Sequence, residues 1–362
     1  MPELPKALAT WFPLVPRARP LCAPLDKRIA AVSTMAERAR NATEAAAALN
    51  LTALITSDIG AHDLARDLCW NQFLVFAKHA PLNAERAVLA MEPIINLARL
   101  ATREGDGDRA HHILDQALTA ATDHISTWID QREVDVAAMA VDRHGRNAMQ
   151  EKLWIAFLSD GARALTRAGR WTEARQAAER CSGIGNRLLD GRQTAIIATI
   201  AADETDATQA LIASTEVIEP WEEALITYFE MCSSAALRDS PDAKSRLLID
   251  QIVGLALPQE QQLFQVRLGL SVLELACLGR AASELAATFG PIAMRDGDAY
   301  AARDLLSSPT FRRSIDPAGA AHLAEVLHRS GLEQGAEPAL RERLELIADV
   351  AVAQLSRDLA EH

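Results

Sequence analysis

Two octets with a shared residue pattern carry the side chains that are best suited to ligand chemistry in this chain. Residues 98–105 and 162–169 both read Ala-Arg-x-x-Thr-Arg-x-Gly. Each octet places two arginines four residues apart, so on a helix they lie on one face, one turn from each other. Neighbouring guanidinium groups bind carboxylates or phosphates through paired hydrogen bonds. The octets therefore predict ligand contacts at Arg99, Arg103, Arg163 and Arg167.

The same arginines have a structural interpretation. A glycine follows the second arginine of each octet by two positions, which places the arginines near the ends of their helices. Cations there complement the carbonyl end of a helix, and their aliphatic stems cover neighbouring apolar surface. Both interpretations stay open from the sequence.

Patterns that are typical of catalysis or metal binding are missing from the sequence. The five cysteines are widely spaced without a Cys-x-x-Cys pair, which predicts reduced thiols in a cytoplasmic protein and no metal site. The glycine-rich segment 183–193 follows no predicted strand and lacks the Lys-Ser/Thr of a phosphate loop. No nucleophile motif of the Gly-x-Ser-x-Gly type occurs. We expect no cofactor, and a non-catalytic protein is favoured over an enzyme.

The composition predicts a helical, soluble protein. Alanine is abundant, whereas aromatic residues make up 4% and Gly and Pro number 17 and 15 among 362 residues. Hydrophobic residues at 49% and charged residues at 24% exclude a disordered chain. The net charge of −12 argues against direct binding of nucleic acid. No apolar run reaches the roughly 18 residues that a membrane span needs, so we expect no membrane partner.

Small and apolar residues recur along the chain in the register of paired helices. The clearest pair runs over residues 158–178, with small residues where two helices cross and Gly169 at the end of the first helix. The register recurs over 49–69 and 94–114, and more weakly over 198–210, 231–243 and 272–279. The anchor alanines stand 45, 64, 36 and 33 residues apart, at Ala65, Ala110, Ala174, Ala210 and Ala243.

These pairs resemble tetratricopeptide repeats, whose period is about 34 residues. The resemblance covers about residues 40–280 and implies an all-α fold, a right-handed superhelical array of antiparallel helix pairs. It also implies groove-facing positions for Asn50, Arg99, Arg163 and Arg192, with Arg103 and Arg167 one turn further on. Family members that clamp a terminal carboxylate use Lys and Asn, and only Asn50 matches a clamp position here.

Three ranges are expected along the chain. Residues 1–24 hold six of the 15 prolines and predict an extended leader, which either docks through its apolar residues at 11–15 or stays a loosely tethered tail. We expect the helical fold to survive deletion of this leader. Residues 25–280 form one continuous array of repeats, with an insertion at 123–150 that is either a linker or contains a small β-hairpin near 126–136.

Residues 281–362 are expected to form a C-terminal helical extension. Helices are predicted at 281–289, 299–306 and 317–329, followed by a long helix from about Pro338. One face of the long helix carries an apolar stripe, which either closes the open end of the array or binds a partner.

The leading functional hypothesis is a non-catalytic scaffold that binds an acidic peptide or protein segment in a concave groove, for assembly or regulation. A first alternative is a helical enzyme or an accessory subunit of a biosynthetic complex, because the Ala-rich, Arg-over-Lys composition resembles that of actinobacterial proteins. A second alternative is the sensor module of a peptide-responsive transcriptional regulator that lacks its own DNA-binding domain.

Overall fold

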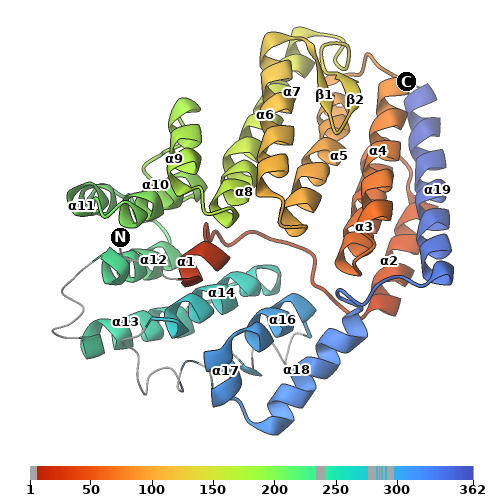
Figure 1. Ribbon diagram of the computed structural model, residues 1–362. Helices are drawn as coiled ribbons and strands as arrows, with labels where there is room; N and C mark the ends of the chain where they lie inside the picture. The colour runs from red at the N-terminus through yellow and green to blue at the C-terminus, as the bar shows by residue number, and fades with distance from the viewer. Residues whose placement is uncertain are drawn as a thin grey trace. The chain divides into compact units, whose positions relative to one another are not determined.

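Helices dominate the fold, as the composition predicts. The computed structural model describes residues 6–233, 241–275, 283, 285, 287, 290–291 and 297–361. Among these residues one two-stranded antiparallel sheet accompanies the helices, so the prediction of an all-α protein with a small hairpin is confirmed (Figure 1). Most of the helix predicted at 281–289 lies outside the described residues, as do parts of the weak repeat copies at 231–243 and 272–279.

The chain forms two compact units whose segments alternate along the sequence. Unit 1 comprises Met1–Ala23 and Gly169–Ser330, and unit 2 comprises Pro24–Ala168 and Gly331–His362. These boundaries follow a different division from the expected ranges 1–24, 25–280 and 281–362. One boundary falls between Ala168 and Gly169, within the helix pair that most resembles a tetratricopeptide repeat.

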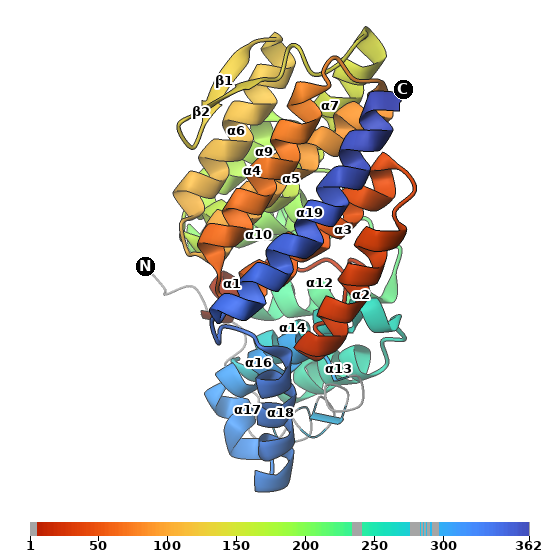
Figure 2. The ribbon, with the colours of Figure 1, turned by 90° about the vertical axis from the view of Figure 1, so that its right-hand side faces the viewer.

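Unit 2 consists of helices that pack on their neighbours in the sequence. Successive helices from α2 to α6 lie against one another, and α5 also contacts α3 and α7 (Figure 2). A π-helical turn, Phe157–Gly161, joins α7 to α8. The helices are α2 (Leu25–Arg38), α3 (Ala42–Asp58), α4 (His62–Lys78), α5 (Ala84–Arg103), α6 (Gly107–Asp123), α7 (Arg143–Ala156), α8 (Ala162–Arg167) and α19 (Pro338–Glu361).

Local sequence explains where these helices begin and how closely they pack. Asn41 and Asn83 accept N–H groups of the first turn of α3 and α5, which satisfies donors that a helix start leaves unpaired. Gly105 ends the turn after α5 with φ 83°, a conformation that other residues rarely adopt. A Cβ atom on Gly107 of α6 would stand 2.3 Å from the Ala164 carbonyl oxygen of α8. Glycine, which has no Cβ atom, is therefore required at this helix crossing.

The predicted hairpin is formed by β1 (Ser126–Ile129) and β2 (Arg132–Asp135). Both turn residues, Asp130 and Gln131, have positive φ angles, as a two-residue hairpin turn requires. Arg109 of α6 donates to the Asp130 carboxylate at 2.8 Å and 2.5 Å, so the hairpin is fastened to the helices below it. The rest of the expected insertion, from Arg143 onward, belongs to α7.

The long C-terminal helix α19 completes unit 2 by packing on α2, α3 and α4. Its predicted apolar stripe is buried there, at Leu344, Ile347, Ala351, Leu355 and Leu359. Arg341 pairs with Asp63 of α4, and Arg86 of α5 pairs with Asp358 at 2.8 Å. The stripe is therefore used within the chain, against the first helices of unit 2.

Unit 1 is built from short helices around an aromatic and aliphatic core. Trp171 is buried in this core, which also contains Trp221 and Phe264. The helices predicted at 299–306 and 317–329 are present. The helices are α1 (Lys6–Trp11), α9 (Trp171–Arg180), α10 (Asp190–Ala201), α11 (Thr205–Ala213), α12 (Pro220–Ser233), α13 (Pro241–Val253), α14 (Gln262–Leu273), α16 (Ala299–Ser307), α17 (Pro309–Ser314) and α18 (Pro317–Ser330).

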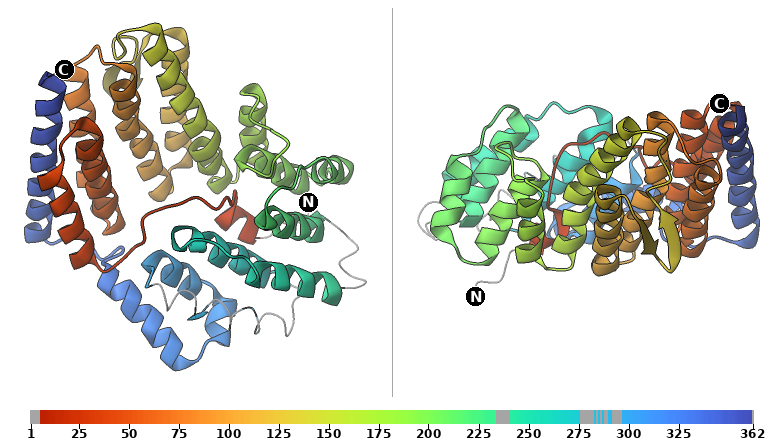
Figure 3. Two further views of the ribbon diagram at one scale, coloured as in Figure 1. Left: turned by 180° about the vertical axis from the view of Figure 1, so that it is seen from behind. Right: turned by 90° about the horizontal axis from the view of Figure 1, so that it is seen from above.

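The N-terminal segment, residues 6–23, packs into unit 1, and the alternative of a loosely tethered tail is wrong for these residues. Helix α1 lies against α14, and the extended stretch that follows runs among the helices of the unit (Figure 3). Leu8, Phe12 and Leu14 are fully or almost fully buried in the core. The sequence could not show this docking, because the residues that receive the segment lie more than 170 positions away. The structure thus argues against a fold that is indifferent to loss of the segment.

Replacing Phe12 with Ala tests how firmly this segment is docked. The Phe12 side chain is 1% exposed, so we expect Phe12→Ala to lower the free energy of unfolding by about 3 kcal/mol, as for other buried aromatic side chains. Trp128→Ala is the control, because this aromatic residue is 61% exposed and its loss should cost under about 0.5 kcal/mol. Urea unfolding followed by circular dichroism measures both, and equal small losses would contradict the docking.

The ion pair between Arg341 and Asp63 predicts a lowered pKa for the Asp63 carboxyl group. The hydrogen bond from Arg341 lowers the pKa of Asp63 to about 2, and the Leu64 N–H lowers it further in the same direction. Because the folded pKa lies below the ordinary value of about 3.9, the stabilisation is present above that value and is lost as the pH falls toward 2.

We expect an NMR titration of the Asp63 carboxyl to give a pKa of about 2 in the wild type. In Arg341→Ala the pKa should rise toward about 3.9. High salt should shift it in the same direction, because the Asp63 side chain is 65% exposed and the pair is screened. An unchanged pKa in the variant would show that Arg341 does not hold Asp63.

Candidate functional site

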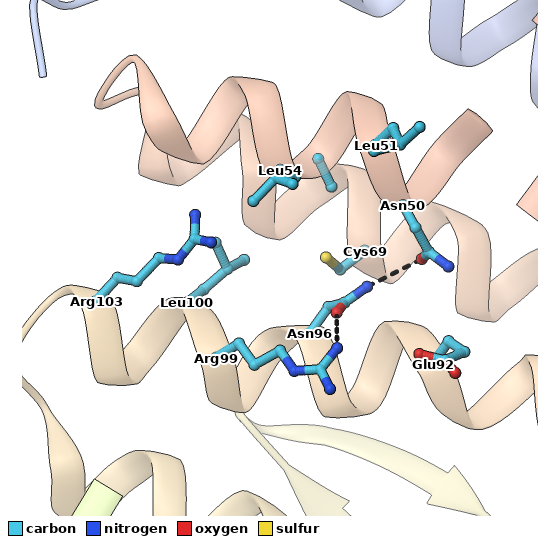
Figure 4. A pocket seen from close by; sticks show the side chains of 10 residues that line it. Asn50, Leu51, Leu54, Cys69, Glu92, Asn96, Arg99, Leu100 and Arg103 are labelled. Carbon is cyan, nitrogen blue, oxygen red and sulfur yellow. Dashed lines mark hydrogen bonds between the residues drawn. The ribbon is translucent and has the colours of Figure 1, made fainter. Parts of the chain in front are cut away.

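A hollow of about 270 Å³ opens on unit 2 where α3, α4 and α5 meet (Figure 4). Its lining combines amide, guanidinium and apolar side chains. Three of the six predicted site residues, Asn50, Arg99 and Arg103, come together here. The lining residues are Asn50, Leu51, Ala53, Leu54, Cys69, Glu92, Asn96, Arg99, Leu100 and Arg103.

A chain of hydrogen bonds along one side of the hollow links α3 to α5. The Asn96 Nδ2 group donates to Asn50 Oδ1 at 2.9 Å, and Arg99 Nη1 donates to Asn96 Oδ1 at 3.1 Å. Asn96 and Arg99 are three residues apart on α5 and therefore share a helix face. Among the described residues no hydrogen bond uses the Nδ2 donors of Asn50.

Arg99 is braced by a carboxylate on its other side. Its Nε atom donates to Asp160 Oδ2 at 2.9 Å, and Nη2 lies 2.9 Å from the same oxygen. Asp160 belongs to the π-helical turn between α7 and α8. The Arg99 side chain is still 47% exposed, so the guanidinium group is held in place while part of it faces solvent.

Arg103 reaches the far end of the hollow and contacts a buried carboxylate. Its Nη1 atom donates to Ser57 Oγ and to Asp58 Oδ1, both at 3.1 Å. Arg28 of α2 also donates to Asp58, at 2.6 Å, and the Asp58 side chain is 2% exposed. One negative charge is thus shared by two guanidinium groups, and Arg103 is 39% exposed toward the hollow.

The floor of the hollow is apolar and chemically inert. Leu51, Leu54 and Leu100 line it together with Cys69 (Figure 4). Burial raises the pKa of the Cys69 thiol to about 12, so the thiol stays protonated and is not a nucleophile near neutral pH. At the rim, Glu92 is paired with Lys152 of α7.

Arg163 and Arg167 are not part of this hollow. Both lie on α8, where Arg163 is half-buried and Arg167 is exposed. Both take part in interactions with other groups of the protein.

Arg192, the sixth residue predicted to contact a ligand, lies apart from the hollow and has a structural role in the other unit. It lies in unit 1 and is 6% exposed. Its guanidinium group donates to the Leu211 carbonyl at 2.8 Å and the Gly185 carbonyl at 3.2 Å, and also to hydroxyl groups of Ser214 and Thr215. Burial lowers the pKa of Arg192. Arg192 thus donates a hydrogen bond to an unpaired carbonyl at the C-terminal end of α11. The sequence pattern suggests the same structural role for arginines at helix ends.

Asn96 is the site residue that sequence reasoning missed, although the repeat contained a signal for it. Asn96 stands 46 residues after Asn50, close to the spacing of 45 between the anchor alanines of the same two helix pairs. The two asparagines thus occupy matching places on α3 and α5. Asp58 and Asp160 left no such signal, because only their spatial position makes them partners of the arginines.

Among the described residues, no group of three or more His, Cys, Asp or Glu side chains stands in a position to hold a metal ion. No helix within the described ranges combines the length and the apolar character that crossing a membrane requires.

Removing the Asp58 charge tests the electrostatic anchor at the end of the hollow. In Asp58→Asn the buried ion pair with Arg28 is lost, so we expect the free energy of unfolding to fall by about 3 kcal/mol. Asp63→Asn removes a carboxylate that is 65% exposed and should cost less than about 1 kcal/mol. Urea unfolding of both variants at pH 7 gives the comparison, and a similar loss in the two would show that Asp58 is no anchor.

Comparison with known proteins brought no relatives: no protein-family model matches the sequence, and no curated protein or solved structure matches the chain.

Proposed function

We propose that this protein is a tetratricopeptide-like scaffold and that the hollow of unit 2 binds a short peptide segment bearing a carboxylate. In unit 2, α5 packs on both α3 and α7, with α4 and α6 between them in the sequence. This packing is expected when the first helices of successive pairs line one face of a right-handed superhelical array. The resemblance and the packing support the same architecture.

The row formed by Asn50, Asn96 and Arg99 is the observation that carries the proposal. An asparagine amide offers both a donor and an acceptor, so two of them in line suit the alternating N–H and C=O groups of an extended peptide. The hydrogen bonds and ion pairs along the row hold its side chains in place before a ligand arrives, which lowers the entropic cost of binding.

Arg99 and Arg103 supply the preference for a carboxylate. They stand one turn apart on α5, and both are partly exposed at the hollow. A ligand carboxylate would add a second carboxylate partner to each guanidinium group, beside Asp160 for Arg99 and Asp58 for Arg103. Because these partners already take part of the positive charge, the proposal predicts moderate affinity and a strong dependence on salt.

The size and floor of the hollow limit the ligand. A space of about 270 Å³ is at the small end for ligand pockets, which suits one or two residues of a peptide and not a large cofactor. The floor of Leu51, Leu54 and Leu100 favours an aliphatic side chain next to the carboxylate. A binding role is also favoured because the Cys69 thiol at this floor stays neutral.

Selection from a library of random peptides tests the proposal. The wild-type protein should enrich peptides with an acidic residue or a free terminal carboxylate beside an aliphatic residue. Asn96→Ala with Arg99→Gln should weaken binding of a selected peptide about tenfold or more, because one amide and one charge-assisted contact are lost. Neither change touches Asp58, so the fold should be preserved, as circular dichroism can verify.

Lys27→Gln is the matched control for this experiment. Lys27 is an exposed cation on α2 that does not line the hollow. Its replacement should leave the dissociation constant within about twofold of the wild type, since it removes only a distant charge. If no peptide is enriched, or if the double variant binds like the control, the hollow is not the binding site.

A further inference from the structure

The N-terminal segment lies in unit 1 as an extended peptide lies in a binding groove. After α1 it has no regular secondary structure from Phe12 to Pro24, yet its backbone and side chains are held along its length. The residues that hold it come from α10, α12, α14 and the start of α16. These elements are far from the segment in sequence. Together they contact three features of the segment: its main chain, its aromatic rings and its positive charges.

The buried side-chain amide of Gln193 forms two hydrogen bonds with the main chain of Leu14. The Leu14 N–H donates to Gln193 Oε1 at 2.7 Å, and Gln193 Nε2 donates back to the Leu14 carbonyl. Gln193 is fully buried. Further along, the Cys22 N–H donates to Asp298 Oδ1 and the Ala299 N–H donates to the Cys22 carbonyl, both at 3.0 Å. Such contacts recognise an extended backbone whatever its side chains.

Aromatic side chains of unit 1 receive the start of the segment. The Phe12 ring stacks on Tyr228, with centroids 5.3 Å apart, and is also 5.3 Å from the Phe229 ring. Trp11 lies under the guanidinium group of Arg267, at 5.5 Å. These contacts bury a large apolar surface and fix the register of the segment.

The two arginines of the N-terminal segment form ion pairs with buried carboxylates. Arg17 pairs with Asp190, and Arg19 pairs with Asp298 and lies 4.7 Å from the centre of the Tyr300 ring. The side chains of Asp190 and Asp298 are 7% and 6% exposed beneath the segment. A buried carboxylate is costly unless it is paired, so the groove requires a basic occupant.

We propose that unit 1 contains a second peptide-binding groove, selective for an extended segment with an aromatic residue followed by arginines five and seven positions later. The chain's own residues 6–23 fill it, and the occupant that replaces them is the same segment of a second copy of this chain. The segment passes into unit 2 directly after Ala23, so a change in the backbone there frees it for another molecule. This inference is independent of the hollow in unit 2.

The exchange has a simple thermodynamic basis. The segment makes the same contacts whether it comes from its own chain or from a second copy. The two states therefore differ mainly in the effective concentration that the covalent link provides, which is on the order of millimolar for short linkers. The wild type should accordingly be monomeric when dilute and form an exchanged dimer as its concentration approaches this range.

The first test uses a fluorescent synthetic peptide of residues 6–23 as the probe. In the full-length chain, Arg17→Ala with Arg19→Ala should weaken the internal segment, and this variant should then bind the probe at least tenfold more tightly than the wild type does. A peptide with both arginines changed to Glu should bind at least tenfold more weakly than the unchanged probe. Arg312→Ala with Arg313→Ala removes two exposed arginines of unit 1 and should behave like the wild type.

The second test measures molar mass by light scattering as the concentration of the full-length chain rises. A dimer of the wild type that an excess of the unlabelled 6–23 peptide converts to monomer, together with capture of the probe by the Arg17/Arg19 variant, supports the proposal. A monomer throughout, or a dimer that the excess peptide leaves intact, overturns a second copy as the occupant. Failure of every full-length chain to capture the probe overturns the groove itself.

Hydrogen exchange of the wild type keeps the proposal testable if the variant does not fold. An exchangeable segment requires the Leu14 N–H to exchange through a local opening, faster than the core amides of α10 and α12. Exchange of the Leu14 N–H only at the rate of those core amides would show that the segment opens with the whole unit, and would overturn the proposal.

Discussion

The buried carboxylate of Asp58 is the interaction on which unit 2 depends. It accepts hydrogen bonds from Arg28 of α2 and Arg103 of α5, while the Asp58 carbonyl accepts the N–H of Glu333, just before α19. One residue at the end of α3 thereby contacts the first helix of the unit, a helix of the next pair and the segment that returns from the C-terminal part of the chain. Because the carboxylate is buried, its partners cannot be exchanged for water without a large desolvation cost.

Buried polar groups also hold the N-terminal segment in unit 1. Gln193 is buried in unit 1 and pairs with both main-chain groups of Leu14, and nearby carboxylates pair with Arg17 and Arg19. Each unit is thus completed by a terminal segment. Residues 6–23 complete unit 1 through buried polar and aromatic contacts, and α19 completes unit 2 through its buried apolar stripe. The sequence order of the segments alternates between the units, so neither unit is complete until chain far away in the sequence has joined it.

The hollow of unit 2 owes its character to this packing. Asp58 holds Arg103 in place, and Asp160 holds Arg99. Asn96 links Arg99 to Asn50 by hydrogen bonds. Arg99 and Arg103 therefore have the structural role that is one interpretation of their sequence pattern. They brace neighbouring elements and, being partly exposed, still present donors at the hollow. In unit 1, by contrast, Arg192 is buried, and its guanidinium group donates hydrogen bonds to carbonyl and hydroxyl groups of the same unit.

The sequence by itself determined the helical class and the apolar stripe of α19, and it offered the hairpin near residues 126–136 as one of two alternatives. These features depend on propensity and on periodicity over a few residues, which a single segment expresses on its own. The register of the repeats also contained the match between Asn50 and Asn96, which stand 46 residues apart.

Only the tertiary structure decided which arginines are available to a ligand, where the chain divides and whether the N-terminal segment docks. Each of these outcomes depends on groups that meet through space, such as Asp58 with Arg103 or Gln193 with Leu14. Burial and pairing of charge are properties of the assembled interior, where desolvation decides which polar groups must find partners. A linear pattern can show that an arginine faces the end of a helix, but not which carboxylate, carbonyl or solvent the fold places opposite it.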